Sequence, residues 1–434
     1  MASTYITKTF GSAGSLTTWT LSFWVKKAGN GIEQRIFSCD DDASGNDDQW
    51  MKFDSADIIQ FSQYQSGYTQ KIETNRKFRD INGYYHIVLV WDTTNGTAAD
   101  RTRLYVNGVR ETSFSSEVQA SSSLASLINN TTYPLEIGRR GNNNTQFFPG
   151  LLSHVHFCDG TALAPTVFGE TDATTGEWKI KTTITPSSAW GDNGYLILKD
   201  GNSVTDQSGE GNNFTVNGTL TKTEDCPSNV FATWNPLDGL YQGGTGSNGN
   251  TTWQTNNSLY SYRPATLGAS SGKFYWEVKY VAKSGGNDYP LIGITSTQTA
   301  ASKGVGDYPN DWGWYIAGST SYLRNNSSNT SWGNAYTVGD IVGVALDCDN
   351  NKLYLSKNGV FQESGNPSSG SNGVSITAPS STPLGLYFPA FTYYDGTYNG
   401  TFSANFGNGY FGTTAVSSAG TNASGIGIFE YDVP

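Results

Sequence analysis

The stretch Arg103-Leu-Tyr-Val-Asn-Gly-Val-Arg-Glu111 identifies the fold class most directly. A short apolar-alternating run leads into Asn107-Gly108, and a second short run follows directly. The order Asn-Gly between two such runs favours a type I′ turn, because both central residues of that turn need a positive φ. The stretch therefore predicts a tight antiparallel β-hairpin.

The same arrangement returns in the second half of the chain. The apolar run 340–347 ends in an acidic turn, and Lys352-Leu-Tyr-Leu-Ser-Lys then meets Asn358-Gly359. We interpret the two stretches as similar hairpins in two separate sandwiches. One such pair does not establish an internal duplication.

Other runs have the length of a strand. Some alternate between apolar and polar residues, which indicates half-buried strands, and others are almost wholly apolar, which indicates central strands. They are Trp19–Lys26, Tyr84–Trp91, Tyr133–Gly138, Gly150–Phe157 and Lys273–Tyr280. Apolar residues nowhere recur at the spacing of an amphipathic helix over several turns. We therefore predict an all-β fold made of two antiparallel, jelly-roll-like β-sandwich modules.

Length and composition support two modules. The chain has 434 residues, more than one hydrophobic core usually serves. Prolines and the run Gly243–Asn250 make the middle of the chain loop-rich, which is typical of a boundary. We expect a first sandwich over residues 1–180, a connector with short strands over 181–261, and a second sandwich over 262–434. The runs Tyr195–Leu198 and Asn213–Val216 are candidate short strands that pack onto either module.

Charge and composition exclude several classes of function. The net charge is −11 and no basic run occurs, so a nucleic-acid partner is not expected. No stretch approaches the roughly 18 apolar residues of a membrane span, and Met1–Phe10 lacks the pattern of a secretion signal. The three histidines and four scattered cysteines supply neither a catalytic triad nor a metal or redox motif.

The first module resembles the laminin-G-like, concanavalin-type jelly rolls of phage tail and particle-surface proteins. The resemblance lies in Trp19–Lys26, His86–Asp92, Leu104–Val109, Glu136–Gly138 and Phe148–Phe157, followed by a marker similar to one in marine phage proteins at Asp159–Pro165, Phe168–Glu170 and Gly176–Lys179. The connector is similar to those proteins as well, through Asp206–Thr215 and Phe231–Leu237. The third part resembles the SPRY domain through Phe274–Val278, Ile292–Ile294, Val338–Asp347, Leu353–Gly359, Phe388–Ala390 and Asn405–Gly407.

This resemblance implies a bacteriophage virion protein on the particle surface, made in the host cytoplasm. As a tail-fibre-like or receptor-binding adhesin it would recognise a host surface glycan or protein. The alternative is a capsid decoration, knob or fibre protein whose sandwiches bind other virion proteins of the tail or capsid. The resemblance also implies a homo-oligomer, with a trimer as one arrangement, although no heptad or β-helix stretch enforces it.

Aromatic residues in Gly- and Asn-rich stretches are the candidate ligand-binding residues, because sugars stack on aromatic faces and amphipathic rings suit binding surfaces. These residues are Trp312, Tyr322, Trp332, Tyr393, Tyr394 and Tyr398. The competing interpretation places such rings in the sandwich core, where we expect Trp314, Phe388 and Phe391. Trp312, Trp332 and Tyr398 are the ones expected to be exposed.

Acidic residues near the start of the chain could supply oxygen ligands to Ca²⁺. They are Asp40, Asp41, Asp42, Asp47 and Asp48. Their spacing does not match a known calcium loop, so a solvated acidic loop is the alternative, and no cofactor is required. A polysaccharide-degrading enzyme would need two facing carboxylates, and no predicted strand carries such a pair. We therefore expect a protein that is not an enzyme.

Overall fold

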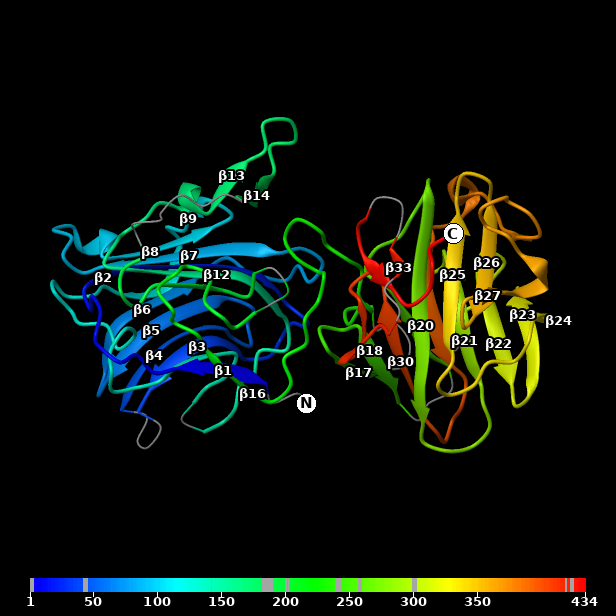
Figure 1. Ribbon diagram of the computed structural model, residues 1–434, viewed down its shortest axis with the longest axis horizontal. Helices are drawn as coiled ribbons and strands as arrows, with labels where there is room; N and C mark the ends of the chain where they lie inside the picture. The colour runs from blue at the N-terminus through cyan, green and yellow to red at the C-terminus, as the bar shows by residue number, and fades with distance from the viewer. Residues whose placement is uncertain are drawn as a thin grey trace. The chain divides into compact units, whose positions relative to one another are not determined.

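The computed structural model describes residues 4–41, 46–141, 143–181, 190–199, 201, 203–238, 243–256, 260–298, 303–417, 420–421 and 425–434. Within these ranges the chain forms antiparallel strands and no α-helix, which confirms the all-β prediction. Single 3-10 turns are η1 (Ala98–Asp100), η2 (Pro165–Val167), η3 (Gln362–Ser364) and η4 (Pro379–Ser381). Two compact units result: Met1–Lys222 with Cys226–Val230, and Thr223–Asp225 with Phe231–Pro434 (Figure 1).

The first unit contains an eight-stranded and a six-stranded sheet. In spatial order the larger sheet holds β10 (Phe114–Val118), β6 (Tyr68–Thr74), β5 (Ile59–Gln65), β4 (Asp47–Phe53), β3 (Gln34–Asp40), β11 (Leu135–Ile137), β1 (Tyr5–Lys8) and β16 (Thr215–Asn217). The smaller sheet holds β15 (Tyr195–Ile197), β12 (Leu151–Asp159), β2 (Thr18–Lys26), β7 (Tyr85–Asp92), β8 (Thr102–Val106) and β9 (Val109–Arg110). A separate hairpin joins β13 (Gly169–Thr171) to β14 (Trp178–Ile180).

Strand β7 is almost wholly apolar because both of its faces are buried. Its residues Ile87, Leu89 and Trp91 face the main core, where Trp91 stacks on Trp19 at 5.9 Å. The alternate residues Val88 and Val90 belong to a second apolar cluster on the other face of the sheet. Because both faces are covered, neither set of positions can be polar.

The second unit repeats the two-sheet plan. Its larger sheet runs β17 (Gly244–Ser247), β18 (Thr252–Thr255), β30 (Gly400–Asn405), β20 (Lys273–Lys283), β25 (Ile341–Asp347), β26 (Lys352–Lys357) and β27 (Val360–Phe361), with β28 (Val374–Ser375) also paired to β26. Its smaller sheet runs β19 (Ser261–Pro264), β29 (Phe388–Tyr393), β21 (Pro290–Thr295), β22 (Trp312–Ala317), β23 (Thr320–Asn325) and β24 (Ser328–Ser331). Two further hairpins pair β31 (Tyr410–Phe411) with β32 (Thr414–Ala415) and β33 (Gly420–Thr421) with β34 (Ile428–Phe429).

Both Asn-Gly turns form as predicted. Asn107 and Gly108 have φ of 48° and 78° between β8 and β9, and Asn358 and Gly359 have φ of 49° and 81° between β26 and β27. Each asparagine side chain also accepts a backbone N–H bond from a neighbouring strand, at 2.8 Å from His86 and 2.9 Å from Ile341. The turn residues therefore fix the loop and link it to the next strand.

The compact units divide the chain differently from the predicted three parts. The stretch predicted as a connector, 181–261, supplies β15 and β16 to the first unit and β17 and β18 to the second. The physical reason is burial: Tyr195, Ile197 and Phe214 belong to the main core of the first unit, and Trp253 to that of the second. The described part of this stretch is thus integral to the sandwiches.

Candidate functional site

The smaller sheet of the second unit carries a group of tyrosines on its outer face. In β22, Trp312, Trp314 and Ile316 point into the core, so Tyr315 points outward. Directly opposite Tyr315 lies Tyr322 on β23, which therefore shares that face. Beyond the strand ends lie Tyr260, Tyr289 and Tyr394. The Tyr394 N–H donates to the Tyr289 carbonyl at 3.0 Å, and the Tyr394 ring contacts that of Tyr260.

These five residues, Tyr260, Tyr289, Tyr315, Tyr322 and Tyr394, are called the tyrosine face below. Ring centroids are 4.5 Å apart for Tyr260 and Tyr394, 6.2 Å for Tyr289 and Tyr394, and 6.2 Å for Tyr315 and Tyr322. All five side chains are half-buried. Neighbouring rings therefore support one another while part of each ring stays open to solvent.

A loop covers the other half of the same sheet face. Val305 packs with Tyr262 and Ala390 in a small apolar cluster, and its N–H donates to the Thr392 hydroxyl at 2.9 Å. Gly306 allows the close approach, because it has φ of 85° and a Cβ there would lie 2.6 Å from the Arg324 carbonyl. The loop thus leaves the tyrosine face as the open part of this surface.

Charges beside the tyrosine face are paired. The Arg324 guanidinium lies 5.8 Å from the Tyr315 ring, and its Nε donates to the carboxylate of buried Asp307 at 2.8 Å. Lys283 pairs with Asp288 at 3.0 Å. Burial and the neighbouring Tyr394 raise the pKa of Tyr260 to about 12, so its hydroxyl stays protonated at neutral pH. The face therefore offers aromatic rings beside paired charges and, at Tyr260, a neutral hydroxyl.

The structure brings only part of the predicted aromatic set together. Tyr322 and Tyr394 lie on the tyrosine face. Trp312 and Tyr393 were expected at a ligand surface but are 6% and 0% exposed, because strand alternation turns both rings into the core. That part of the prediction is corrected.

The two remaining predicted residues are half-buried and lie elsewhere. The Trp332 ring packs edge-on against core Trp314 at 5.2 Å. Tyr398 covers Gly285 and Gly286, where an added Cβ would meet its ring at 2.7 and 2.4 Å. Of the residues expected in the core, Trp314 and Phe391 are fully buried and Phe388 is half-buried.

The predicted set of ligand-binding residues did not include Tyr260, Tyr289 and Tyr315. Their grouping with the rest of the tyrosine face depends on the register of five strands, which pairs residues distant in sequence. One local signal existed for Tyr315: it alternates with Trp314 and Ile316, so it had to leave the core once Trp314 was placed there.

The structure describes four of the five predicted calcium ligands and gathers no three of these four into one metal-binding group. Asp40 and Asp48 lie opposite each other on β3 and β4, where Asp48 contacts Arg35 at 3.2 Å. The alternate residue Asp47 accepts a bond from the Tyr133 hydroxyl at 3.0 Å, and Asp41 accepts one from the Asn46 N–H at 3.4 Å. Asp42 lies outside the described residues. Within the described ranges no three His, Cys, Asp or Glu side chains form a metal-binding group.

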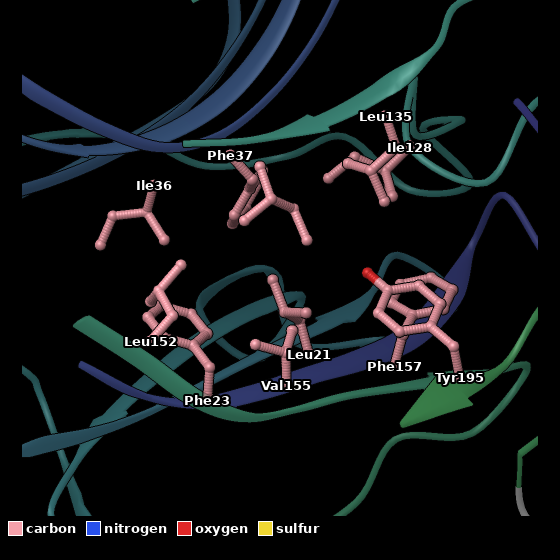
Figure 2. A pocket seen from close by; sticks show the side chains of 11 residues that line it. Leu21, Phe23, Ile36, Phe37, Ile128, Leu135, Leu152, Val155, Phe157 and Tyr195 are labelled. Atoms are coloured by element: carbon pink, nitrogen blue, oxygen red, sulfur yellow. The ribbon is translucent and has the colours of Figure 1, made fainter. Parts of the chain in front are cut away.

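A small hollow lies inside the first unit, between its two sheets. Figure 2 shows two rows of side chains that face each other across it. Its lining is aliphatic and aromatic throughout: Leu21, Phe23, Ile36, Phe37, Ile128, Leu135, Ile137, Leu152, Val155, Phe157 and Tyr195. Its residues belong to the main core of the unit or pack against it, so we interpret the hollow as an inter-sheet packing gap.

The described part of the chain contains no helix of the length and hydropathy needed to cross a membrane.

Comparison with known proteins identifies both units. Residues 2–167 match the concanavalin A-like lectin/glucanases superfamily, and residues 273–409 match the SPRY domain. A Ran-binding proteins 9/10 homolog of Drosophila melanogaster is 30% identical over 92 residues, which are 21% of this chain and 9% of that protein. The SPRY domain of human HERC1 is 16% identical, with 35% of this chain and 86% of that chain covered and a TM-score of 0.27. A SAP-like pentraxin from Limulus polyphemus is 16% identical, with 37% and 71% covered and a TM-score of 0.28. The chain thus contains a concanavalin A-like lectin/glucanase module followed by a SPRY domain.

Proposed function

We propose that this chain is a bacteriophage particle-surface protein that recognises a host surface glycan or protein without catalysing a reaction. The tyrosine face of the SPRY domain makes the contact. The observation that carries the proposal is the grouping of five half-buried tyrosines on one sheet face beside paired charges.

The chemistry of this face suits recognition. A tyrosine ring offers a large apolar surface with little conformational freedom to lose, and its hydroxyl adds a directional hydrogen bond. A pyranose ring or an aromatic-rich protein patch can use both properties at once. Two of the rings stand on strands and the other three lie directly at strand ends. The rings are therefore positioned before the ligand arrives, which lowers the entropic cost of binding.

The placement on a phage particle is supported by sequence motifs rather than by the tyrosine face. The relevant stretches are Phe148–Lys179 and Phe231–Leu237, which resemble segments of marine phage surface proteins. The concanavalin-like match of the first module accords with a protein that works by binding.

The test is binding of the purified chain to host cells and to isolated envelope glycans. Tyr322→Ala and Tyr394→Ala should each weaken binding about tenfold, as expected for a tyrosine at the centre of an interface. Tyr68→Ala is the matched control, since Tyr68 is 44% exposed but belongs to the first unit.

Two outcomes would contradict the proposal. One is a folded chain that binds no host fraction. The other is a particle reconstruction in which the tyrosine face is covered by another virion protein, which would assign the chain to particle assembly instead.

A further inference from the structure

The tyrosine face has a closed floor. Tyr315 lies opposite Leu291 on β21, and Leu291 lies opposite Thr392 on β29, so the three residues share one face of the sheet. Leu291 and Thr392 are 3% and 0% exposed, whereas the five tyrosines are half-buried. A ligand therefore meets the faces and edges of the rings, and the floor between them is already filled.

Uncharged polar groups continue the tyrosine face toward the edge of the sheet. Ser331 on β24 lies opposite Tyr322, and Asn329 lies opposite Arg324. All four residues of β24 are exposed. A pyranose ring carries an apolar C–H face and several hydroxyls, so aromatic rings beside amides and hydroxyls match both parts of it.

Arg324 borders the tyrosine face, and its charge is compensated there. Its Nε and Nη2 donate to one oxygen of the Asp307 carboxylate at 2.8 and 2.5 Å, and its Nη1 donates to the Asn329 amide oxygen at 2.8 Å. The Asp307 side chain is 1% exposed, and its other oxygen accepts the Gly304 N–H at 2.8 Å. An anionic ligand would therefore meet no uncompensated positive charge at Arg324.

We infer that the tyrosine face selects an uncharged glycan, and that Asp307 sets this selectivity by compensating the charge of Arg324. The inference rests on the proposed function and names the ligand class of the same face. The net charge of −11 acts in the same direction, because it repels anionic polymers before contact. A protein is the less favoured ligand, because the filled floor at Leu291 and Thr392 leaves no room there for an anchoring side chain.

The first experiment measures which host fraction the full chain binds. The probes are host envelope polysaccharide, separated by anion exchange into an uncharged and an acidic fraction, and detergent-extracted host surface protein. We expect binding to the uncharged fraction, with a Kd that changes less than about twofold between about 50 and 500 mM NaCl, because salt screens only charged contacts. Tyr322→Ala should weaken this binding about tenfold.

The outcomes of this experiment separate the inference from the proposed function. Binding that depends on Tyr322 but goes to the acidic fraction or to surface protein would overturn the inference and leave the proposed function standing. A Kd for the uncharged fraction that rises about tenfold with salt would also overturn the inference, because charge would then contribute to recognition. No Tyr322-dependent binding to any of the three probes would overturn both.

The second experiment uses the full-length variant Asp307→Asn. Asparagine keeps an acceptor oxygen but removes the negative charge, so Arg324 becomes an uncompensated cation beside the rings. At about 50 mM NaCl this variant should bind the acidic fraction at least about tenfold more tightly than the unmodified chain, and added salt should remove the gain. Asp349→Asn is the matched control, because it makes the same change of charge at an exposed residue in the turn after β25 of the larger sheet.

Adding Arg324→Gln to Asp307→Asn tests whether the gain comes from Arg324. The double variant should lose the gain, which a purely structural role of Asp307 would not predict. Circular dichroism and tryptophan fluorescence check that each variant is folded. A folded Asp307→Asn chain that binds the acidic fraction no better than Asp349→Asn would show that Asp307 does not set the selectivity. If Asp307→Asn does not fold, the salt series on the unmodified chain still decides between a charged and an uncharged ligand.

Discussion

His86 in the first unit is a buried histidine held in one neutral form. Its ring lies between Trp24 at 4.6 Å and Trp178 at 5.9 Å, nearly parallel to both. The Trp178 indole N–H donates to Nδ1 at 3.0 Å, so the ring proton sits on Nε2, 2.9 Å from the Ser22 hydroxyl. This cage could not be predicted from the sequence, because Trp178 is 92 residues downstream and no local pattern links it to His86.

Burial lowers the pKa of His86 from 6.5 to about 3, which predicts a loss of stability in mild acid. Between these two values the unfolded chain binds a proton that the folded chain does not, so the free energy of unfolding falls as pH drops below about 6.5. The slope should approach about 1.4 kcal/mol per pH unit from this group. Urea unfolding between pH 7.5 and pH 4 measures it.

The matched variants for this prediction are His86→Gln and His154→Asn. His86→Gln should be less stable at pH 7.5 and should show a shallower decline with acid. His154 is half-buried and has φ of 49°, which asparagine tolerates, so His154→Asn should keep the steep decline. An unchanged slope in His86→Gln would contradict the assignment.

The two Asn-Gly hairpins share a further feature at the scale of elements. Each turn glycine lies against an aromatic ring from a later segment: a Cβ would be 2.5 Å from the Trp178 ring at Gly108 and 2.6 Å from the Tyr431 ring at Gly359. Gly108→Ala should therefore lower the free energy of unfolding by more than the roughly 1 kcal/mol expected for alanine at a positive φ, because the Trp178 indole must also move. Gly318→Ala is the control, because Gly318 has φ of 67° with no atom within 4 Å of a Cβ. Equal changes in the free energy of unfolding, measured with urea, would refute the docking of Trp178 on this turn.

The strands themselves could be predicted because their signals are local. Alternation placed one strand at Trp19–Lys26, against the observed Thr18–Lys26. A nearly continuous apolar run placed another at Tyr84–Trp91, against Tyr85–Asp92. Register is different, because it depends on which strands become neighbours. Tyr315 and Tyr322 meet across β22 and β23, whereas Tyr260 and Tyr394 meet across a much longer stretch of chain. The candidate site was therefore only partly predictable, although its fold was.

At the scale of the whole molecule, two modules were predictable from length and motif content, but their limits were not. The stretch after residue 181 looks like a linker because its apolar runs are short and rich in turn residues. In its described part, single polar side chains add to the burial of Tyr195 and Phe214: Asp206 accepts the N–H groups of Leu196 and Asn212 at 2.8 and 2.9 Å, which links β15 to the following loop. Such tertiary bonds leave no periodic signal in the sequence.

Because the two units have separate hydrophobic cores, we expect them to unfold in two separate calorimetric transitions. Phe157 belongs to the main core of the first unit and Phe402 to that of the second, and each is at most 1% exposed. Phe→Ala in a core costs about 3–5 kcal/mol, so each substitution should lower the Tm of one calorimetric transition by several degrees and leave the other in place. Val109→Ala is the control, because Val109 is 62% exposed and should move neither transition. A single transition that shifts with both substitutions would mean that the two units unfold as one cooperative body.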